Sequence, residues 1–220
     1  MKVMIHACPE RMWYVKDYLV PSLKTQGIKQ ANITVWNDTA GDGCLVSCLK
    51  SFASCDSDGA TWHLQDDVLI AHDFAERAEE LDKSGYNVVH GFCHTLFEPF
   101  NRPMLWDVPA IFAFNSFPCI RIPNSMAREF VRWVYDDASK RPEYENWIRS
   151  GKHDDSLWHD FFVERYPHER CWNEAPALVE HVDWLIGGST VNAWRGYICR
   201  ASYWEDEYLI EDLKRKLARH

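Results

Sequence analysis

The sequence predicts a single α/β domain in which helices cover both faces of a mostly parallel sheet. Three observations support this fold class. The first 95 residues alternate short apolar runs with helical segments, an order typical of parallel sheets. The chain has 220 residues, a length typical of one domain with a substantial core. Hydrophobic residues make up 46% of the chain, which suits a sheet that is buried on both faces.

Four strands and three helices are expected in the first half of the chain. The strands are predicted at residues 2–8, 31–38, 60–70 and 86–94, and the helices at residues 9–27, 44–55 and 71–85. Gly27 and Gly85 mark the ends of the first and third helices. Pro21 should interrupt or kink the first helix, because proline removes a helical hydrogen bond.

The second half is less regular, and its first part is rich in proline. Its elements are expected as strands at 110–116, 117–123 and 176–185, helices at 124–140, 153–167 and 207–220, and a polar connection at 141–152. Asn124 or Ser125 is a suitable cap for the first of these helices. Residues 186–206 contain glycines and aromatic side chains and are predicted to be mostly loop.

Composition excludes several classes of partner. The formal net charge of −9 argues against binding to nucleic acid or to an anionic membrane through overall electrostatic attraction. No apolar run reaches membrane-spanning length and the first ten residues lack a signal-peptide core, so a cytoplasmic protein with no membrane partner is expected. Its eight cysteines are then expected to be thiols, and the absence of a CxxC pair argues against a zinc site.

Two adjacent carboxylates, Asp66 and Asp67, interrupt the apolar run "TWHLQDDVLI". They fall near the end of the third strand, and ligands of parallel sheets bind beyond the carboxyl ends of the strands. Hard cations such as Mg²⁺ and Mn²⁺ prefer oxygen ligands and leave positions for a substrate phosphate. The pair therefore indicates a cation site, and the alternative is a solvated turn at a strand end.

The segment "LQDDV" resembles the acidic metal-binding motif of the GT-A glycosyltransferases. Four further segments resemble this family in the same order: "HACPERMWYVKDYLVPSL", "VWNDTAGDG", "HDDSLWHDFF" and "PALVEHVDWLIGGS". The resemblance covers roughly residues 1–190. It implies a Rossmann-like three-layer sandwich of the GT-A type with a mostly parallel central sheet. It also implies a single glycosyltransferase-like domain with a donor half at 1–95, an acceptor half at 96–205 and a terminal helix at 206–220.

The resemblance implies a role for each matching residue. Asp67 and His181 would bind a divalent cation, Mn²⁺ or Mg²⁺, and Asp66 would bind the donor sugar or its ribose. The nucleotide would lie against Pro9, Arg11 and Asp38. Gln65 stands where the family often has a third acidic residue. Arg11 as a solvated helix residue, and His181 as a core or surface histidine, are the structural alternatives.

The expected activity is metal-dependent transfer of a sugar from a nucleotide sugar, with a UDP-sugar as the default donor, to a hydroxyl acceptor. A small molecule, a glycan, a protein and a modified DNA base are all open as acceptors. An inverting enzyme needs a carboxylate base, and the candidates are Asp155 and Asp154, either of which could instead cap a helix. A retaining enzyme needs no such base.

Two other functions compete with sugar transfer. "HDDSLWHD" could form a metal cluster of its own, because its His153–Asp154 pair is similar to that of HD-type phosphohydrolases. Those enzymes are all-helical, whereas the first half of this chain is rich in strands. The third possibility is a catalytically inactive protein of the same fold that binds a sugar or a nucleotide. The presence of the acidic pair, Asp66 and Asp67, argues against it.

Overall fold

The computed structural model describes residues 1–56, 58–92, 104–109, 117–187, 201 and 204–218. Within them, a seven-stranded sheet runs in the order β2-β1-β3-β7-β5-β8-β6, and β4 and β9 form a separate two-stranded sheet. In the large sheet β1 is parallel to β2 and β3, and β5 is parallel to β8, whereas β7 and β6 run antiparallel to their neighbours. Five of its seven strands thus share one direction, so the sheet is mostly parallel.

The first half of the chain confirms the predicted alternation of strands and helices. Its elements are β1 (Val3–Ala7), α1 (Met12–Tyr14), α2 (Val20–Thr25), β2 (Ile33–Asn37), α3 (Cys44–Ala53), β3 (Ala60–Gln65), β4 (Val68–Ile70), α4 (Phe74–Lys83) and β5 (Val88–His90). A π-helical turn at Val15–Leu19 joins α1 to α2. This irregularity directly precedes Pro21, which cannot donate the next helical hydrogen bond.

The predicted strand at 60–70 is two strands in different sheets. β3 ends at Gln65, Asp66 and Asp67 form a turn, and β4 leaves to pair with β9. The break has a physical cause, because both carboxylates and the Asp67 carbonyl group bind groups from other segments. The acidic pair therefore lies at a bend between two sheets.

The second half departs further from the sequence prediction. Its elements are β6 (Met104–Pro109), β7 (Cys119–Pro123), α5 (Asn124–Asp136), α6 (Pro142–Ser150), α7 (Asp154–Arg165), β8 (Arg170–Ala175), β9 (Val179–His181) and α8 (Glu207–Leu217). β6 and β8 were not predicted, and β9 covers only part of the strand expected at 176–185. The strand expected at 110–116 lies outside the described residues.

Two local predictions in this half are wrong. Asn124 does not cap α5 but is its first residue, and its side chain ties the helix to the start of β3 by accepting from Thr61 Oγ1 and donating to the Asp58 carbonyl oxygen. The polar connection at 141–152 is mostly helix α6, which has proline in its first turn and Gly151 in the left-handed region after its last residue.

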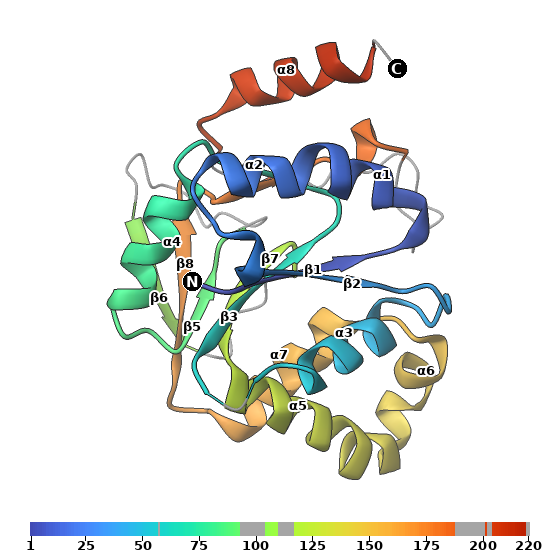
Figure 1. The fold of residues 1–220 in the computed structure, drawn as a ribbon. Coiled ribbons are helices and arrows are strands. Elements are labelled where there is room, and N and C mark those ends of the chain that lie inside the picture. The colour runs from blue at the N-terminus through green and yellow to red at the C-terminus, as the bar shows by residue number, and fades with distance from the viewer. Residues whose placement is uncertain (57, 93–103, 110–116, 188–200, 202–203, 219–220) are drawn as a thin grey trace.

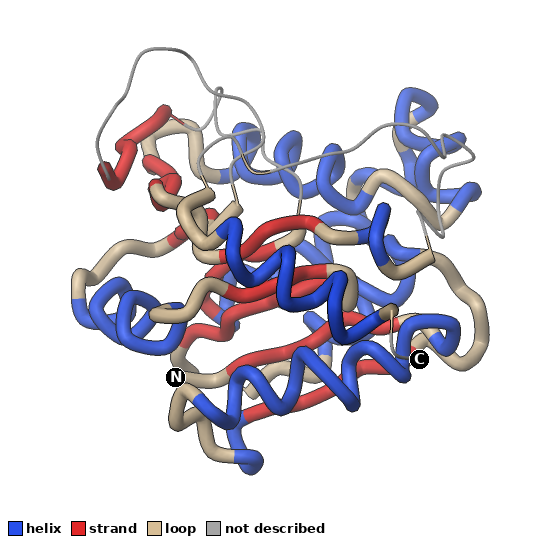
Figure 2. The backbone as a smooth tube through the Cα atoms, turned by 90° about the horizontal axis from the view of Figure 1, so that it is seen from above, coloured by secondary structure: helices blue, strands red, loops and turns tan. Residues whose placement is uncertain are grey.

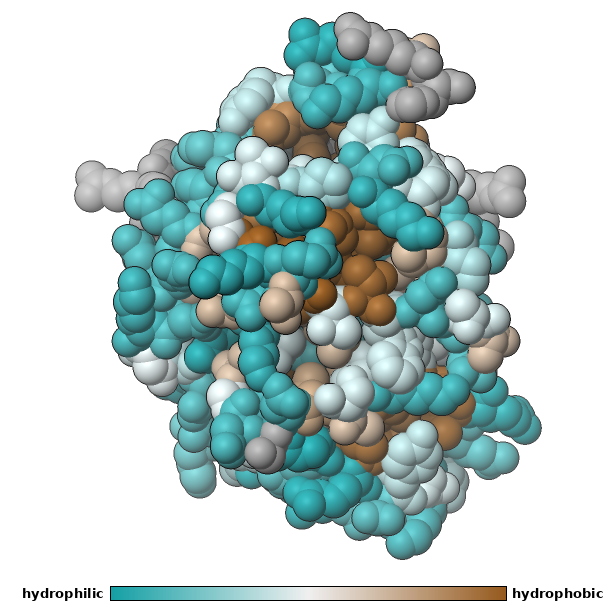
Figure 3. Space-filling view, in the orientation of Figure 1, coloured by the Kyte–Doolittle hydropathy of each residue, from teal (hydrophilic) through white to brown (hydrophobic). Residues whose placement is uncertain are grey.

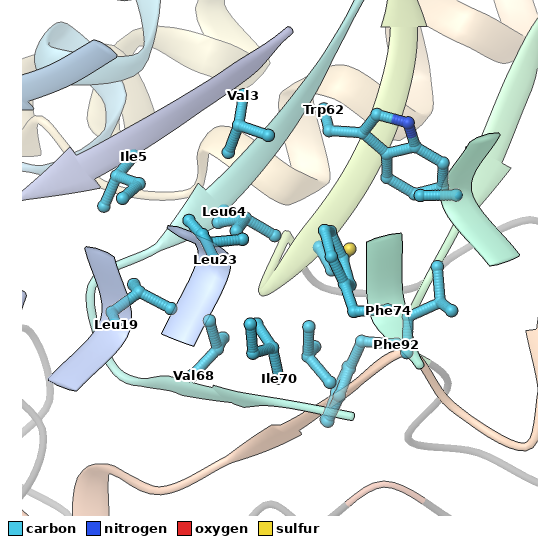
Figure 4. Packing of buried hydrophobic residues seen from close by; sticks show 14 of the residues in the cluster. Val3, Ile5, Leu19, Leu23, Trp62, Leu64, Val68, Ile70, Phe74 and Phe92 are labelled. Atoms are coloured by element: carbon cyan, nitrogen blue, oxygen red, sulfur yellow. The ribbon is translucent and has the colours of Figure 1, made fainter. Parts of the chain in front are cut away.

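Helices cover both faces of the large sheet (Figure 1). One core packs α1, α2, α4 and α8 against it, and Figure 4 shows part of this core, including Ile5, Leu64 and Phe74. The other core packs α3, α5, α6 and α7 against the opposite face, around Phe52, Phe130 and Phe161. The view from above in Figure 2 shows helices lying across the strands. The result is a three-layer sandwich.

The surface agrees with this layering. Hydrophilic side chains cover most of the face in Figure 3, and hydrophobic ones come to the surface in a few smaller areas, including one beneath α8 and one near the centre. Within the described residues, the large hydrophobic side chains that are exposed are Trp13, Tyr135 and Tyr208. They come from three separate elements, α1, α5 and α8.

Candidate functional site

One cavity of about 980 Å³ opens beyond the carboxyl ends of β1, β2 and β3. Segments that are far apart in the sequence line it: the residues after these three strands, the start of α7 and the end of β9. All the residues to which the sequence prediction gives a site role are among its lining residues, namely Pro9, Arg11, Asp38, Asp66, Asp67, Asp154, Asp155 and His181. The fold therefore brings the candidate residues together at the edge where ligands of parallel sheets bind.

The acidic pair is held by groups at the end of β1. The Cys8 N–H donates to Asp66 Oδ2 at 2.7 Å, and Arg11 Nη1 donates to Asp66 Oδ1 at 3.0 Å. The same Arg11 nitrogen contacts Asp67 Oδ2. All three charged side chains are at most 7% exposed. Arg11 thus binds the carboxylates directly, a contact that the sequence prediction, which gave Arg11 to the nucleotide, did not include.

His181 reaches the acidic pair through the small sheet. β9 pairs with β4 so that His181 lies opposite Val68, and the Val182 N–H donates to the Asp67 carbonyl oxygen at 2.8 Å. His181 Nε2 is 3.1 Å from Asp67 Oδ2, and its Nδ1 is 3.5 Å from Asp183 Oδ1. Strand pairing therefore fixes the imidazole beside the second carboxylate of the pair.

These contacts shift the pKa values of the buried groups. Burial alone would lower the pKa of His181, but Asp67 and then Asp183 raise it to about 9. Burial alone would raise the pKa of Asp67, whereas His181 and Arg11 hold it well below its usual range. For Asp66, burial and the Asp67 charge raise the pKa, against the opposing effect of Arg11. The two carboxylates therefore differ, and Asp67 is the one held firmly in its charged form.

Asp67 and His181 offer a donor set that fits a divalent cation. Their facing atoms are one carboxylate oxygen and one imidazole nitrogen, which Mn²⁺ and related ions accept. Asp67 Oδ1 is buried, and no residue in the described part of the chain forms a hydrogen bond to it. Arg11 and, at a pKa of about 9, the protonated His181 supply positive charge to the two carboxylates, so a cation would have to displace the His181 proton. A cation at this position would give the second carboxylate oxygen a partner.

Asp38 folds back on its own loop. Its Oδ1 accepts from the Asp42 N–H and its Oδ2 from the Gly43 N–H, both at 3.0 Å. Asp38 lines the cavity as the sequence prediction requires, but its carboxylate also shapes the turn between β2 and α3. Each of its oxygens already has a donor before any ligand binds.

The carboxylates at the start of α7 have different surroundings. Asp155 Oδ1 accepts from the Ser156 N–H at 2.7 Å and from Ser156 Oγ at 3.3 Å, so this side chain serves the helix terminus. Asp154 is buried, and burial together with the Asp155 charge raises its pKa to about 6. The preceding residue, His153, has φ 65° in the left-handed region, which is strained for a residue with a side chain. This raised pKa makes Asp154 a stronger proton acceptor than an ordinary carboxylate.

The cavity also contains functional candidates that the sequence prediction missed. His6 on β1 and His63 on β3 line it, and they are hydrogen-bonded to each other, His6 Nε2 to His63 Nδ1, at 2.9 Å. The available signal was a histidine inside each of two predicted buried strands. Only the register of β1 against β3 shows that these two histidines meet.

A second group of possible metal ligands lies elsewhere. His72, Asp73 and Asp206 bring one ligand atom each within 4.8 Å of one another, and none of them lines the cavity. Asp206 is occupied by His72, since it accepts from its backbone N–H and contacts its ring Nδ1, each at 2.9 Å. This group ties the start of α8 to the segment before α4.

The part of the chain that the structure describes has no helix long and apolar enough to cross a membrane. No protein-family model matches the sequence. No curated protein matches it either.

Two solved structures are similar to this fold. The structure of S. aureus TarS 1-349 in complex with UDP has a TM-score of 0.51 at 12% sequence identity, covering 81% of this chain and 60% of that chain. The structure of A197 from STIV has a TM-score of 0.45 at 14% identity, covering 82% of this chain and 85% of that chain. This chain therefore matches about 60% of the TarS structure. The likeness to TarS confirms the GT-A type α/β fold that the sequence predicted.

Proposed function

We propose that this protein is a metal-dependent glycosyltransferase that moves a sugar from a nucleotide sugar, with a UDP-sugar as donor, to a hydroxyl acceptor. One observation carries the proposal. Asp67 and His181, which are distant in the sequence, lie 3.1 Å apart in a cavity that also contains Asp154 and Asp155. A cation site and a candidate base in one cavity are what sugar transfer from a nucleoside diphosphate requires.

The donor would occupy the part of the cavity formed by β1, β2 and β3. Pro9, Arg11 and Asp38 line this part and would lie along the nucleotide, and Asp66 would bind the sugar or the ribose. The structure of TarS with UDP supports this assignment, because a protein of similar fold binds a uridine nucleotide. On this proposal residues 1–95 form the donor half, residues 96–205 the acceptor half and residues 206–220 a terminal helix of one domain.

Asp67 and His181 would hold Mn²⁺ or Mg²⁺. When bound, the ion stabilises the negative charge that develops on the departing diphosphate. The chain supplies the rest of the electrostatic environment. Arg11 keeps the acidic pair in place from the side of β1, and Asp183 contacts the second nitrogen of His181. Asp183 thereby places a negative charge behind the imidazole, without a hydrogen bond to it in this structure.

Asp154 is the proposed base. An acceptor hydroxyl is a weak nucleophile, and a carboxylate that takes its proton speeds an inverting transfer. Asp154 is buried at the cavity and has a raised pKa, whereas Asp155 is engaged by Ser156. Asp155 would then position the start of α7. If the enzyme retains configuration, Asp154 orients the acceptor and no base is needed.

A thermal-shift panel of nucleotide sugars with Mn²⁺ tests this proposal. We expect a UDP-sugar to raise the melting temperature in the presence of Mn²⁺, and we expect Asp67→Ala to abolish the shift. Stabilisation by no nucleotide sugar at all would contradict the proposal. Metal-dependent phosphomonoesterase activity without sugar transfer would identify a phosphohydrolase instead, and binding without any turnover would identify an inactive binding protein.

A further inference from the structure

The cavity lining includes a pair of histidines, His63 buried and His6 partly buried, that the proposed chemistry does not use. His6 and His63 come from adjacent parallel strands, where Met4 lies opposite His63 and His6 lies opposite Gln65. His6 Nε2 and His63 Nδ1 are 2.9 Å apart. Both residues line the cavity, and His63 is only 2% exposed.

The hydrogen-bond partners assign the tautomers of this pair. Ser51 Oγ donates to the Cys48 carbonyl oxygen at 2.8 Å, so toward His6 it can only accept. It lies 3.3 Å from His6 Nδ1 and 3.4 Å from His6 Nε2. Because Nε2 is engaged by His63 Nδ1 at 2.9 Å, a hydrogen on His6 Nδ1 is the arrangement that gives both His6 nitrogens a partner. His6 Nε2 is then an acceptor, and the hydrogen between the two rings belongs to His63 Nδ1. This series of hydrogen bonds leaves His63 Nε2 without a hydrogen, so it can only accept.

His63 Nε2 is buried and has no hydrogen-bond partner among the residues that the structure describes. Burial lowers the pKa of His6 to about 4 and holds that of His63 well below its usual value, so both rings are neutral at physiological pH. A neutral buried acceptor without a donor is unfavourable. A ligand that donates an N–H or O–H group would remove this cost.

The surroundings of His63 suit a flat ring. The centroid of the Phe52 ring lies 4.5 Å from that of His63, and Phe117, Ile120 and Cys48 also line this end of the cavity. Aromatic walls favour a planar ligand that can stack or pack edge-on. At the neighbouring wall, both oxygens of Asp38 already accept backbone hydrogen bonds. Among the described residues, His63 Nε2 is a buried acceptor at this cavity with no donor, whereas each Asp38 oxygen has one.

We propose that His63 Nε2 accepts a hydrogen bond from the imide N–H of a uracil or thymine base, and so selects the donor nucleotide. This proposal rests on the proposed function, because it assumes a nucleoside diphosphate in the cavity. His63 precedes Asp66 by three residues of nearly extended chain, roughly 10 Å. That spacing is comparable to the span of a nucleoside diphosphate from its base to its phosphates, so one ligand can reach both ends.

Uracil and cytosine differ at the atom that His63 would contact. The N3 atom of uracil carries a hydrogen, whereas N3 of cytosine is an acceptor and would face the lone pair of His63 Nε2. A buried site built to accept one hydrogen discriminates strongly against a ligand that lacks it. In this arrangement His63 is a specificity-determining residue, and His6 is a positioning residue that fixes the tautomer of His63.

Calorimetric titration with UDP, CDP and UDP methylated at N3, all with Mn²⁺, tests the proposal. We expect the wild-type protein to bind UDP about tenfold more tightly than either analogue, or better. His63→Phe keeps the ring volume beside Phe52 and should equalise the three affinities. His90→Phe is the matched control, since His90 is also a buried strand histidine but does not line the cavity. It should preserve the preference for UDP.

A second variant tests the role of the tautomer. His6→Phe removes the acceptor for His63 Nδ1–H, which frees His63 to carry its hydrogen on Nε2. The preference should then be erased or reversed toward CDP, an effect that loss of packing alone does not produce. Thermal unfolding of each variant shows that it is folded at the temperature of the titration.

The outcomes separate the two proposals. Equal affinities of the wild-type protein for UDP and CDP, or a His63→Phe variant that still prefers UDP, would overturn the assignment of His63 while leaving metal-dependent sugar transfer intact. Failure to bind any of the three nucleotides would overturn the proposed function and the assignment with it. Tight UDP binding that is lost specifically on N3 methylation and in His63→Phe supports both.

Discussion

Asp67 is the residue at which the charged contacts of the cavity meet. Arg11 and His181 both contact its Oδ2, and its Oδ1 has no hydrogen-bond partner in the described part of the chain. Removing one carboxylate charge while keeping the shape of the side chain therefore tests the cation site. We expect Asp67→Asn to weaken Mn²⁺ binding about 100-fold or more, since even residues behind metal ligands cost 10–100-fold. Electron paramagnetic resonance of free Mn²⁺ measures this directly.

Asp58→Asn is the matched control for that experiment. Asp58 is an exposed carboxylate just before β3 and does not line the cavity. The Asp58→Asn substitution removes one negative charge, as Asp67→Asn does, from a residue nearby in the sequence. A loss of Mn²⁺ affinity in Asp58→Asn as large as that in Asp67→Asn would show that overall charge, and not the Asp67–His181 pair, determines binding.

Asp154 should set the pH dependence of the reaction if it acts as the base. Its pKa of about 6 means that the ionised form dominates only above that pH. We expect the rate of sugar transfer to fall as pH drops through 6, and Asp154→Asn to lower kcat by about 10²–10⁴-fold. Asp155→Asn should have a smaller effect. A pH–rate profile of the wild type and both variants checks this, and a rate that is flat from pH 5 to 8 would contradict it.

Asp154 should also make stability depend on pH. The pKa in the folded protein, about 6, lies above the ordinary 3.8, so the folded state holds this proton more tightly than the unfolded state. The stabilisation is complete below about pH 4 and is lost as pH rises through 6, by about 3 kcal/mol. Asp154→Asn removes this loss.

Urea unfolding at pH 4 and at pH 7 measures the effect. Relative to the wild type, Asp154→Asn should gain up to about 3 kcal/mol of unfolding free energy on going from pH 4 to pH 7. Asp155→Asn, which changes the partly buried neighbour, provides the comparison. If Asp154→Asn gains nothing between the two pH values, Asp154 is not the buried group with the raised pKa.

At the scale of elements, a close backbone contact joins the start of α3 to the end of α6, just before α7. The Leu45 N–H donates to the Gly151 carbonyl oxygen at 2.9 Å, and a Cβ atom on Gly151 would lie 2.7 Å from the Asp42 carbonyl oxygen. Gly43 packs against Gly151 just as closely from the other side. This contact fixes the loop after β2, with Asp38, relative to the carboxylates of α7.

Gly151→Ala should disrupt this contact. It combines a positive φ of 66° with a clash against backbone, which cannot move aside cheaply. Gly41→Ala is the matched control, because Gly41 has φ 69° but nothing within 4 Å of the added Cβ. We expect Gly41→Ala to cost about 1 kcal/mol of stability from backbone strain and Gly151→Ala about 2–3 kcal/mol or more. Equal losses in denaturant unfolding would show that the contact contributes nothing.

The sequence predicted the elements whose local signals agree with their tertiary roles. The strands β1 and β5 are short buried runs, β2 is a partly buried edge strand, and α7 starts at the carboxylates as expected. β8 was missed because it alternates buried and exposed residues over the polar sequence "RCWNEA". α6 was missed because it buries only Tyr144, although proline at its start and Gly151 at its end were readable signals.

The sequence could predict those site residues that directly follow predicted parallel strands. Asp38, Asp66 and Asp67 follow parallel strands, so their convergence at one edge could be expected. The ion pairs of Arg11 and the meeting of His6 with His63 depend on register and helix packing, which no local pattern encodes. The sequence therefore indicated which residues gather, and the fold determines which of them touch.

At the scale of the whole molecule, the cavity is strongly acidic. Its lining carboxylates are Glu10, Asp38, Asp66, Asp67, Asp154, Asp155 and Asp183, whereas its lining Lys and Arg side chains are Arg11 and Lys152. The chain as a whole carries a formal charge of −9. A nucleoside diphosphate is itself an anion, so its binding here needs additional positive charge.

Nucleotide affinity should therefore depend on the metal. We expect UDP to bind about tenfold more weakly, or not measurably, when EDTA removes divalent cations, and we expect added Mn²⁺ to restore binding. Calorimetry in matched buffers measures this, with uridine as the control, because a nucleoside without phosphates should respond little to the metal. Full UDP affinity in EDTA would mean that Arg11 and Lys152 suffice.

The most direct measurement is UDP release from a UDP-sugar by the wild-type protein and by Asp67→Ala, each with Mn²⁺ and with EDTA. A cation held by Asp67 and His181 beside the nucleotide diphosphate predicts slow release of UDP and free sugar by the wild type with Mn²⁺ only. Asp67→Ala should release neither UDP nor free sugar, with Mn²⁺ or with EDTA. Release that persists in EDTA, or that is equal in Asp67→Ala, would contradict the central assignment of the cation site.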